Sequence, residues 1–287
     1  MKRRLILLAL VALVPVVAVA PEATGKGGTP ITTCGQVVTT NAFLTEDLNC
    51  AAGHHGIVVG ANGITVDLKG FTLRGTPSGV DTYGIYLNGR DGVTVSNGVV
   101  RGFTWGVRAF DADRLTVSGV VSSGNVGLGV TISGDLARVV SSKALGNRSG
   151  GIQIFGDSAK IQSSTASGNG ADGIAVSGGN SASVKSSVAS GNAFNGIHLF
   201  GASASVQSST AMGNGYNGIV TSGNDAVVKG NRAEGNGFPE GISDGQDLGI
   251  RAEGFAIGAG PVGKNISRGN DDPQECFPAN QTGWTCN

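Results

Sequence analysis

The stretch GIAVSGGNSASVKSSVASGNAFN, residues 173–195, decides the fold of this chain. Its apolar residues fall in short alternating runs, first Ile174 and Val176, then Ala182 and Val184. Alternation with a period of two is typical of half-buried strands, and no run is long enough for an amphipathic helix. Between the runs stand Gly-Gly-Asn, Ser-Ser and Gly-Asn, which favour tight turns because glycine and, less readily, asparagine adopt positive φ. The stretch therefore predicts one coil of short strands joined by tight turns.

The same pattern recurs along the chain at a nearly constant period. The dipeptide Gly-Asn begins at positions 124, 146, 168, 191, 213 and 235, so the successive steps are 22, 22, 23, 22 and 22. In phase with it, Gly followed by Ile or Val begins at positions 84, 106, 129, 151, 173, 196, 218 and 241. Self-similarity at a fixed period of this length indicates a solenoid.

A coil that closes after about 22 residues stacks each strand in parallel on its counterpart, ~4.8 Å away. Such connections are right-handed in nearly all cases. The sequence thus predicts an all-β fold, a right-handed parallel β-helix of about 8–9 coils with three short parallel sheets. The asparagines of the Gly-Asn pairs should stack into a hydrogen-bonded ladder.

Three columns of side chains should point into the solenoid. The first holds two aliphatic residues after each Gly, such as Ile174 and Val176. The second holds Val117, Val139, Ile161, Val184, Val206 and Val228, and the third holds Ala144, Ala166, Ala189, Ala211 and Ala233. A buried Ile, Val or Leu contributes roughly 1.5–3 kcal/mol and alanine much less, so two walls should carry most of the stability.

The two ends of the chain differ from the repeats. Residues 1–20 join three basic residues to an apolar run and the small-residue ending Ala18-x-Ala20, the pattern of a secretory signal peptide. The alternative is a transmembrane anchor, which the run disfavours because it is only about 15 residues long and contains Pro15. We expect an N-terminal cap over 21–55, the β-helix over 56–258 and a C-terminal cap over 259–287, in a secreted or periplasmic protein.

The four cysteines lie outside the repeats, one pair near each end. In an exported protein this pattern predicts disulfides, and a solenoid holds its two ends far apart. We therefore expect the bridges Cys34–Cys50 and Cys276–Cys286, each worth about 3 kcal/mol. They would close the terminal coils, whose open strand edges otherwise invite aggregation. Zinc binding is the alternative, but the pairs lack the C-x-x-C spacing of zinc sites.

The charge balance limits the partners. Lys and Arg together number 20, as do Asp and Glu, and only 14% of residues are charged. A nucleic-acid partner would need a basic face, so we expect none. We also expect no membrane partner once the signal is removed, and a monomer. Copper favours Met, Cys and His ligands, and Met212 and the pair His54-His55 are too few and too far apart to predict a copper site.

The repeat SGNGADGIAVSGGNSASVKSSVASGN (Ser167–Asn192) resembles the repeats of the right-handed parallel β-helix, or pectin-lyase-like, superfamily. The segment GITVDLKGFTLRG (Gly63–Gly75) looks like the first complete coil of its secreted bacterial members. The resemblance covers about residues 56–258 and implies the fold. It implies little about activity, because the superfamily holds lyases, hydrolases, epimerases, adhesins and proteins without known chemistry.

The resemblance implies that a substrate would lie along the outer face of the first sheet. The outward column there should be Tyr86, Arg108, Thr131, Gln153, Ala175, His198 and Val220. It contains no carboxylate, whereas a glycoside hydrolase needs two facing each other. Pectate lyases of the superfamily use an arginine base and calcium held by clustered acidic residues. Arg108 matches the base in residue type, but no acidic cluster surrounds it on the strands.

An acidic column follows the first strand of successive repeats and ends in Asn180. It consists of Asp91, Asp113, Asp135 and Asp157. Carboxylate oxygens stacked about 5 Å apart would suit calcium. The alternative is structural, because Asp and Asn in turns commonly bond to their own backbone. We expect no cofactor other than weakly bound calcium at this column.

A row of phenylalanines on alternate coils is the best candidate binding surface. Phe110, Phe155 and Phe200 should be spaced roughly 9.6 Å apart, with serines on the coils between them. If the rings point outward, sugars can stack on them; the alternative is local packing at the coil edge. We predict a glycan site where Phe155, His198 and Phe200 converge with Gln153 and Arg108.

Three functions are compatible with this sequence. The first is a secreted, non-catalytic protein that binds polysaccharide or acts as a surface scaffold. The second is a carbohydrate-active enzyme of the lyase or epimerase type, and the third is a structural, self-associating coat protein. The first is favoured because enzymes of this fold usually interrupt their coils with long loops, and residues 106–240 contain none.

Overall fold

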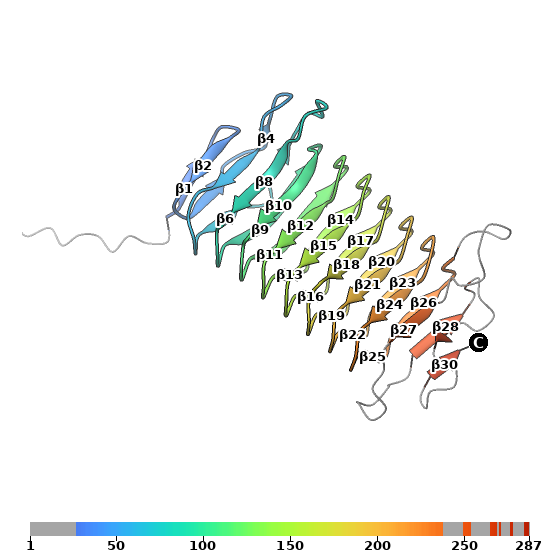
Figure 1. Cartoon of the computed structure of the whole chain (residues 1–287). Helices are drawn as coiled ribbons and strands as arrows, with labels where there is room; N and C mark the ends of the chain where they lie inside the picture. Colours follow the sequence, from blue (N-terminus) through green and yellow to red (C-terminus); the bar gives the residue numbers. More distant parts are fainter. Residues whose placement is uncertain are drawn as a thin grey trace, which may run out of the picture.

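The computed structural model describes residues 27–237, 249–253, 265–268, 270, 276–277 and 284–286. The elements of this part of the chain are short β-strands, and every pairing between them is parallel. Figure 1 shows the strands stacked along one axis, from the blue N-terminal strands to the red C-terminal ones. None of the described residues forms a helix of the length and apolarity needed to cross a membrane. The predicted parallel solenoid is confirmed.

One wall of the solenoid is an 11-stranded sheet, called sheet B below. Its strands are β2 (Gln36–Val38), β5 (Ile57–Val59), β8 (Tyr83–Asn88), β10 (Trp105–Phe110), β12 (Val130–Ser133), β15 (Ile152–Phe155), β18 (Ile174–Ser177), β21 (Ile197–Phe200), β24 (Ile219–Ser222), β27 (Ile250–Glu253) and β29 (Cys276–Phe277).

The other two walls are ladders of a 19-stranded sheet, sheet A. The first ladder contains β1 (Thr29–Ile31), β3 (Ala42–Leu44), β6 (Thr65–Asp67), β13 (Arg138–Val140), β16 (Lys160–Gln162), β19 (Ser183–Lys185), β22 (Ser205–Gln207) and β25 (Val227–Lys229). The second contains β4 (Leu48–Asn49), β7 (Thr72–Arg74), β14 (Lys143–Leu145), β17 (Thr165–Ser167), β20 (Val188–Ser190), β23 (Thr210–Met212), β26 (Arg232–Glu234), β28 (Asn265–Arg268) and β30 (Trp284–Cys286).

Two longer strands join the two ladders of sheet A. β9 (Thr94–Arg101) and β11 (Thr116–Ser123) each pair in the first ladder with their N-terminal half and in the second with their C-terminal half. The three predicted walls therefore exist, but two of them are continuous through these coils. The pairing also reaches into the segment expected as an N-terminal cap, because β2 pairs with β5 and β3 pairs with β6.

The predicted register of the interior is confirmed. All residues named for the second and third inward columns are at most 1% exposed, as are Ile174 and Val176 of the first. A further column, not predicted, lines the corner after sheet B and is alanine throughout the regular coils: Ala137, Ala159, Ala182, Ala204 and Ala226. The equivalent places of the two preceding coils hold Val93 and Leu115, both fully buried.

The asparagine ladder forms as predicted and lies inside the solenoid. The asparagines at 125, 147, 169, 192, 214 and 236 are at most 2% exposed. Each side-chain amide donates to the Oδ1 of the next asparagine, for example from Asn147 to Asn169 at 3.0 Å and from Asn169 to Asn192 at 2.8 Å. The same Oδ1 also accepts the backbone N–H of the asparagine before it. The ladder thus satisfies buried backbone groups as well as its own amides.

The ladder also explains the glycine that precedes each aliphatic residue. A Cβ placed on Gly173 would lie 2.5 Å from the Asn192 amide nitrogen and 2.8 Å from the carbonyl oxygen of Gly196. A second ladder, which was not predicted, runs through Ser142, Ser164, Ser187 and Ser209 at the opposite corner. Each serine Oγ there accepts the backbone N–H of the preceding coil.

The Cys34–Cys50 disulfide is confirmed, with the two Cα atoms 5.6 Å apart. The side chains of Cys276 and Cys286 and the whole of residues 1–20 lie outside the described residues, so the second bridge and the signal peptide stay predictions.

Candidate binding face on sheet B

The outward column of sheet B has the predicted membership. The strand register aligns Tyr86, Arg108, Thr131, Gln153, Ala175, His198 and Val220 and extends the column to Arg251. Neighbours in such a column are one coil apart, ~4.8 Å. Arg108, Gln153 and His198 occupy alternate coils, so they are spread along the face. The single point of convergence that the sequence suggested does not exist.

The phenylalanine row faces outward on two of its three coils. Phe155 is 43% exposed and Phe200 is 45% exposed, so a substantial part of each ring is accessible to a ligand. Phe110 is only half-buried because its ring meets the edge of Tyr86 and covers the Arg108 guanidinium at 4.3 Å. On the coils between, the register places Ser133, Ser177 and Ser222 in the same column.

The N-terminal end of the face carries an aromatic cluster that was not predicted. It consists of His55, Tyr83, Tyr86, Trp105, Arg108 and Phe110. The rings of His55, Tyr83 and Tyr86 stack on one another, with Tyr83 at 4.8 Å from each of the other two and His55 at 6.2 Å from Tyr86. Arg108 lies 4.0 Å above the Trp105 ring, a cation–π contact. Burial, with the nearby Asp81 carboxylate, raises the pKa of Tyr83 above its usual value.

A hydrogen-bonded group surrounds His198 in the C-terminal half of the face. The imidazole Nδ1 lies 3.1 Å from Asp172 Oδ2, while Asp172 Oδ1 accepts the backbone N–H and side-chain amide of Asn195. The His198 ring also contacts Phe200, with ring centroids 4.3 Å apart. Because a carboxylate offers only acceptors, a neutral His198 donates from Nδ1 and presents Nε2 as an acceptor.

Two aromatic rings on adjacent turns extend this group. Phe194 and Tyr216 stack with centroids 5.1 Å apart and planes within 6° of parallel. They occupy equivalent places in the repeated turns Phe194-Asn195-Gly196 and Tyr216-Asn217-Gly218. That 22-residue spacing of Phe-Asn-Gly and Tyr-Asn-Gly was the available signal.

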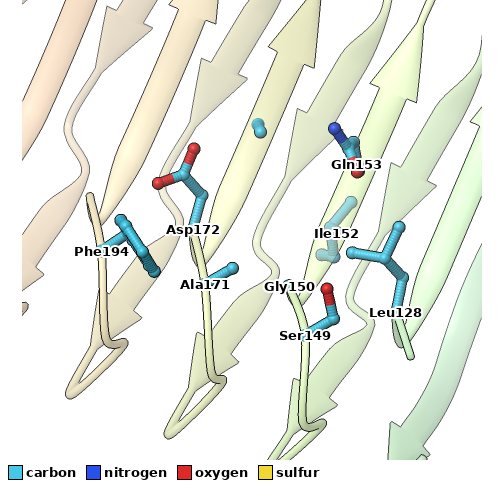
Figure 2. A pocket seen from close by; sticks show the side chains of 9 residues that line it. Leu128, Ser149, Gly150, Ile152, Gln153, Ala171, Asp172 and Phe194 are labelled. Carbon is cyan, nitrogen blue, oxygen red and sulfur yellow. The ribbon is translucent and has the colours of Figure 1, made fainter. Parts of the chain in front are cut away.

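A first cavity, the Ala175 cavity, has a volume of about 200 Å³. Its floor consists of small residues, including Gly150, Ala171 and Ala175, and it exists because larger side chains stand on both sides. Figure 2 shows Leu128 on one side and Phe194 on the other, with Asp172 and Gln153 above. It therefore combines apolar walls with one amide and one carboxylate.

A second cavity, the Val220 cavity, lies two coils further along the same face and has a volume of about 230 Å³. Its floor is Val220, and His198 and Arg251 stand on the coils on either side of it. Phe200 and the amides of Asn195 and Asn217 complete the lining, together with Ser222.

The acidic column has a structural role that differs from the one considered. Each carboxylate accepts the backbone N–H of the next coil, not of its own turn, for example Asp91 from Asp113 at 3.0 Å and Asp113 from Asp135 at 2.8 Å. Asp135 and Asp157 do the same, and Asp91 also faces Arg114 at 3.5 Å. No group of three or more His, Cys, Asp or Glu side chains suited to a metal occurs in the described part of the chain. Calcium binding at this column stays a prediction.

Residues 129–271 match the family model described as "Right handed beta helix region". Among solved structures, the chain is similar to the periplasmic alginate epimerase AlgG, with 12% identity and a TM-score of 0.50 over 77% of this chain and 70% of that one. It is also similar to the A-module of the mannuronan C-5 epimerase AlgE6 of Azotobacter vinelandii, with 13% identity and a TM-score of 0.51 over 88% and 90%. No curated protein sequence matches the chain. The chain thus has the fold of a right-handed parallel β-helix.

Proposed function

We propose that this protein is an exported, non-catalytic polysaccharide-binding or surface-scaffold protein that works as a monomer through the outer face of sheet B. The observation that carries the proposal is the pairing, on one face, of exposed aromatic rings with side-chain hydrogen-bonding groups. Phe155 and Phe200 are largely exposed, and His198, Asn195 and Gln153 lie beside them. Sugars need both an apolar surface for the ring face and polar partners for the hydroxyl groups.

Two further features support the proposal. Phe194, at 45% exposed, adds a third exposed ring to this face, and apolar groups gathered on one surface mark interaction sites. The similar solved structures AlgG and AlgE6 are, by their titles, epimerases of alginate and mannuronan, so this fold occurs in proteins that handle polysaccharides. The Cys34–Cys50 bridge supports an oxidising compartment outside the cytoplasm.

A glycan array with the mature protein tests the proposal, followed by calorimetry on the strongest hit. The double variant Phe155→Ser with Phe200→Ser should stay folded, because serine occupies this column on the coils between. Its binding free energy should weaken by roughly 2–4 kcal/mol if both rings stack on the ligand.

The matched control is Met212→Ser. Met212 is 39% exposed and lies on β23 of sheet A, where the two preceding coils carry Ser190 and Ser167 at equivalent places. It removes a similar exposed apolar group and should leave binding unchanged. Unchanged affinity in the folded double phenylalanine variant would exclude this face as the binding site.

One observation favours a second candidate, a lyase or epimerase. His198 is oriented by Asp172 at 3.1 Å and borders the same cavity as Arg251. A histidine held in one tautomer beside a cation has the elements of an acid–base site, in which the cation stabilises negative charge developing on the substrate. His198→Gln would then abolish turnover of a bound glycan while binding persists. Absence of turnover in the unmodified protein on every glycan it binds would rule this candidate out.

A further inference from the structure

The outer face of sheet B repeats every two coils, not every coil. Its outward column alternates long polar residues with small ones. Arg108, Gln153 and His198 are 45 residues apart (153 − 108 = 45 and 198 − 153 = 45). Thr131 and Ala175 lie between them, and Val220 lies between His198 and Arg251. These small residues are only 5%, 6% and 7% exposed, which makes them the floors of troughs between ridges.

The same two-coil period appears elsewhere in the sequence. Phe110, Phe155 and Phe200 are also 45 residues apart (155 − 110 = 45 and 200 − 155 = 45). The coil 151–172 shares Phe-Gly, Ser-Ser-Thr-Ala and Gly-Asn-Gly with the coil 196–217, while the coil between them lacks all three. The interior needs a period of only one coil, because its aliphatic, alanine and asparagine columns are uniform. The two-coil period is therefore a property of the outer surface and not of the interior.

The two cavities obey this period as well. Four lining residues of the Ala175 cavity have a counterpart 45 positions later in the lining of the Val220 cavity. The pairs are Gly150 with Asn195, Gln153 with His198, Asp172 with Asn217, and Ala175 with Val220. The cavities are thus equivalent sites two coils apart, roughly 9.6 Å along the solenoid axis.

We infer that the two cavities are successive subsites for an extended glycan with a two-sugar repeat, a β-1,4-linked chain lying parallel to the solenoid axis. This inference rests on the proposed function and gives it a substrate class. In such a chain neighbouring sugars face opposite ways, so only every second sugar presents the same edge to a surface. Its chemical repeat is comparable in length to the ~9.6 Å between the subsites.

The chemistry of the subsites suits sugar hydroxyl groups. The Ala175 cavity offers the Gln153 amide and the Asp172 carboxylate between the apolar walls Leu128 and Phe194. The Val220 cavity offers the His198 imidazole beside the Phe200 ring, and its edge is formed by the Asn195 and Asn217 amides, which are hydrogen-bonded to each other at 3.0 Å. The Asp172–His198 hydrogen bond lies between the two cavities and holds their polar groups in fixed relative positions.

Calorimetry with β-1,4-linked oligosaccharides of two, four and six sugars tests the inference. The probes are the glucose, mannose, N-acetylglucosamine and mannuronate series. At least one series should bind, and its affinity should rise at least ~10-fold between two and four sugars, when the second subsite is engaged.

The variants Ala175→Gln and Val220→Gln each fill one trough with a longer side chain, the one that Gln153 carries in the same outward column. Each single variant should bind a four-sugar chain only as tightly as the unmodified protein binds a two-sugar chain. The double variant should bind neither chain. Lys185→Gln, on the exposed side of sheet A, is the matched control and should bind like the unmodified protein.

The outcomes separate the inference from the proposed function. Binding to a polysaccharide without a step between two and four sugars, or with trough-filling variants unchanged, overturns the two-subsite inference alone. Binding to no glycan on the array or in the four series overturns both. A thermal melt close to that of the unmodified protein establishes that the variants are folded.

Discussion

The N-terminal coils and the regular coils that follow fill the same interior corner in different ways. In the coils from residue 124 to 236 the corner between the second ladder of sheet A and sheet B holds the asparagine ladder. One coil earlier, Phe103 occupies this position and is fully buried. Its backbone N–H donates to Asn125 Oδ1 at 3.1 Å. At the corner between the two ladders of sheet A, Val120 precedes the serine ladder in the same way. Its backbone N–H donates to Ser142 Oγ.

A phenylalanine and an asparagine place different requirements on the coils around this corner. A phenylalanine stabilises the corner through buried apolar area and needs only space. An asparagine needs a coil of the same conformation on each side, because its oxygen and its amide bond to opposite neighbours. The turn between β7 and β8 runs from Gly75 to Thr82 and does not match the turns of the later repeats. The corner is therefore filled by an apolar side chain where neighbouring turns differ, and by a hydrogen-bonded ladder where the same turn repeats.

The largest expected effect concerns the walls, which the two regions share. Val184→Asp places an unpaired charge at a site with no exposure, so we expect it to unfold the central coils. Val117→Asp, in the same column of the N-terminal region, should be equally damaging. Circular dichroism and a denaturant titration measure both.

Lys185→Asp, one residue after Val184, faces solvent and should change the free energy of unfolding by less than about 0.5 kcal/mol. Tolerance of Val117→Asp would mean that the two regions differ in their walls and not only in their corners.

The second prediction places leucine at the same corner in each region. Asn169→Leu removes four hydrogen bonds. It leaves the backbone N–H of Asn147 without its acceptor, and the Asn147 side-chain amide keeps only its bond to the Ser122 carbonyl oxygen. Each unsatisfied buried group costs about 1–3 kcal/mol, so we expect a loss of about 4 kcal/mol. Phe103→Leu keeps the corner apolar and should cost about 1 kcal/mol. Equal losses in urea titrations would show that the ladder stabilises by volume and not by hydrogen bonding.

The interior was predictable from sequence because its periodicity is strict. One coil, Gly173–Asn195, determines the inward columns, and the repetition of Gly-Asn reveals the ladder. The outer face was predictable only in part. The register placed Arg108, Gln153 and His198 in one outward column as predicted, but two coils apart from one another and not at a single point. The stacking of His55 on Tyr83 depends on the irregular turn before β8, and the Asp172–His198 bond joins neighbouring coils through a turn and a strand. No repeat pattern encodes either contact.

The third prediction concerns the N-terminal end. Removing the Cys34–Cys50 bridge by the double substitution to serine should cost about 3 kcal/mol of local stability, as expected for a loop of this length. Since solenoid stability is roughly a sum of neighbour contributions, hydrogen exchange should rise in residues 30–55 before the regular coils respond. Simultaneous loss of protection along the chain would show that the bridge supports the whole solenoid.

The smallest expected effects distinguish the two glycines of each regular repeat. Gly168 has φ of 64° and open space around a Cβ, so Gly168→Ala should cost only the left-handed backbone penalty of about 1 kcal/mol. Gly173 has no such φ, but a Cβ there would meet the Asn192 amide at 2.5 Å and the Gly196 carbonyl oxygen at 2.8 Å. Neither neighbour can move without disturbing the ladder, so Gly173→Ala should cost about 2–3 kcal/mol. Thermal unfolding of the two variants measures the difference, and Asn192→Ala should reduce the cost of Gly173→Ala when the two changes are combined. A larger loss of stability in Gly168→Ala than in Gly173→Ala would contradict this expectation. It would mean that the repeat requires glycine for its backbone conformation, and not for the space that the asparagine ladder needs beside Gly173.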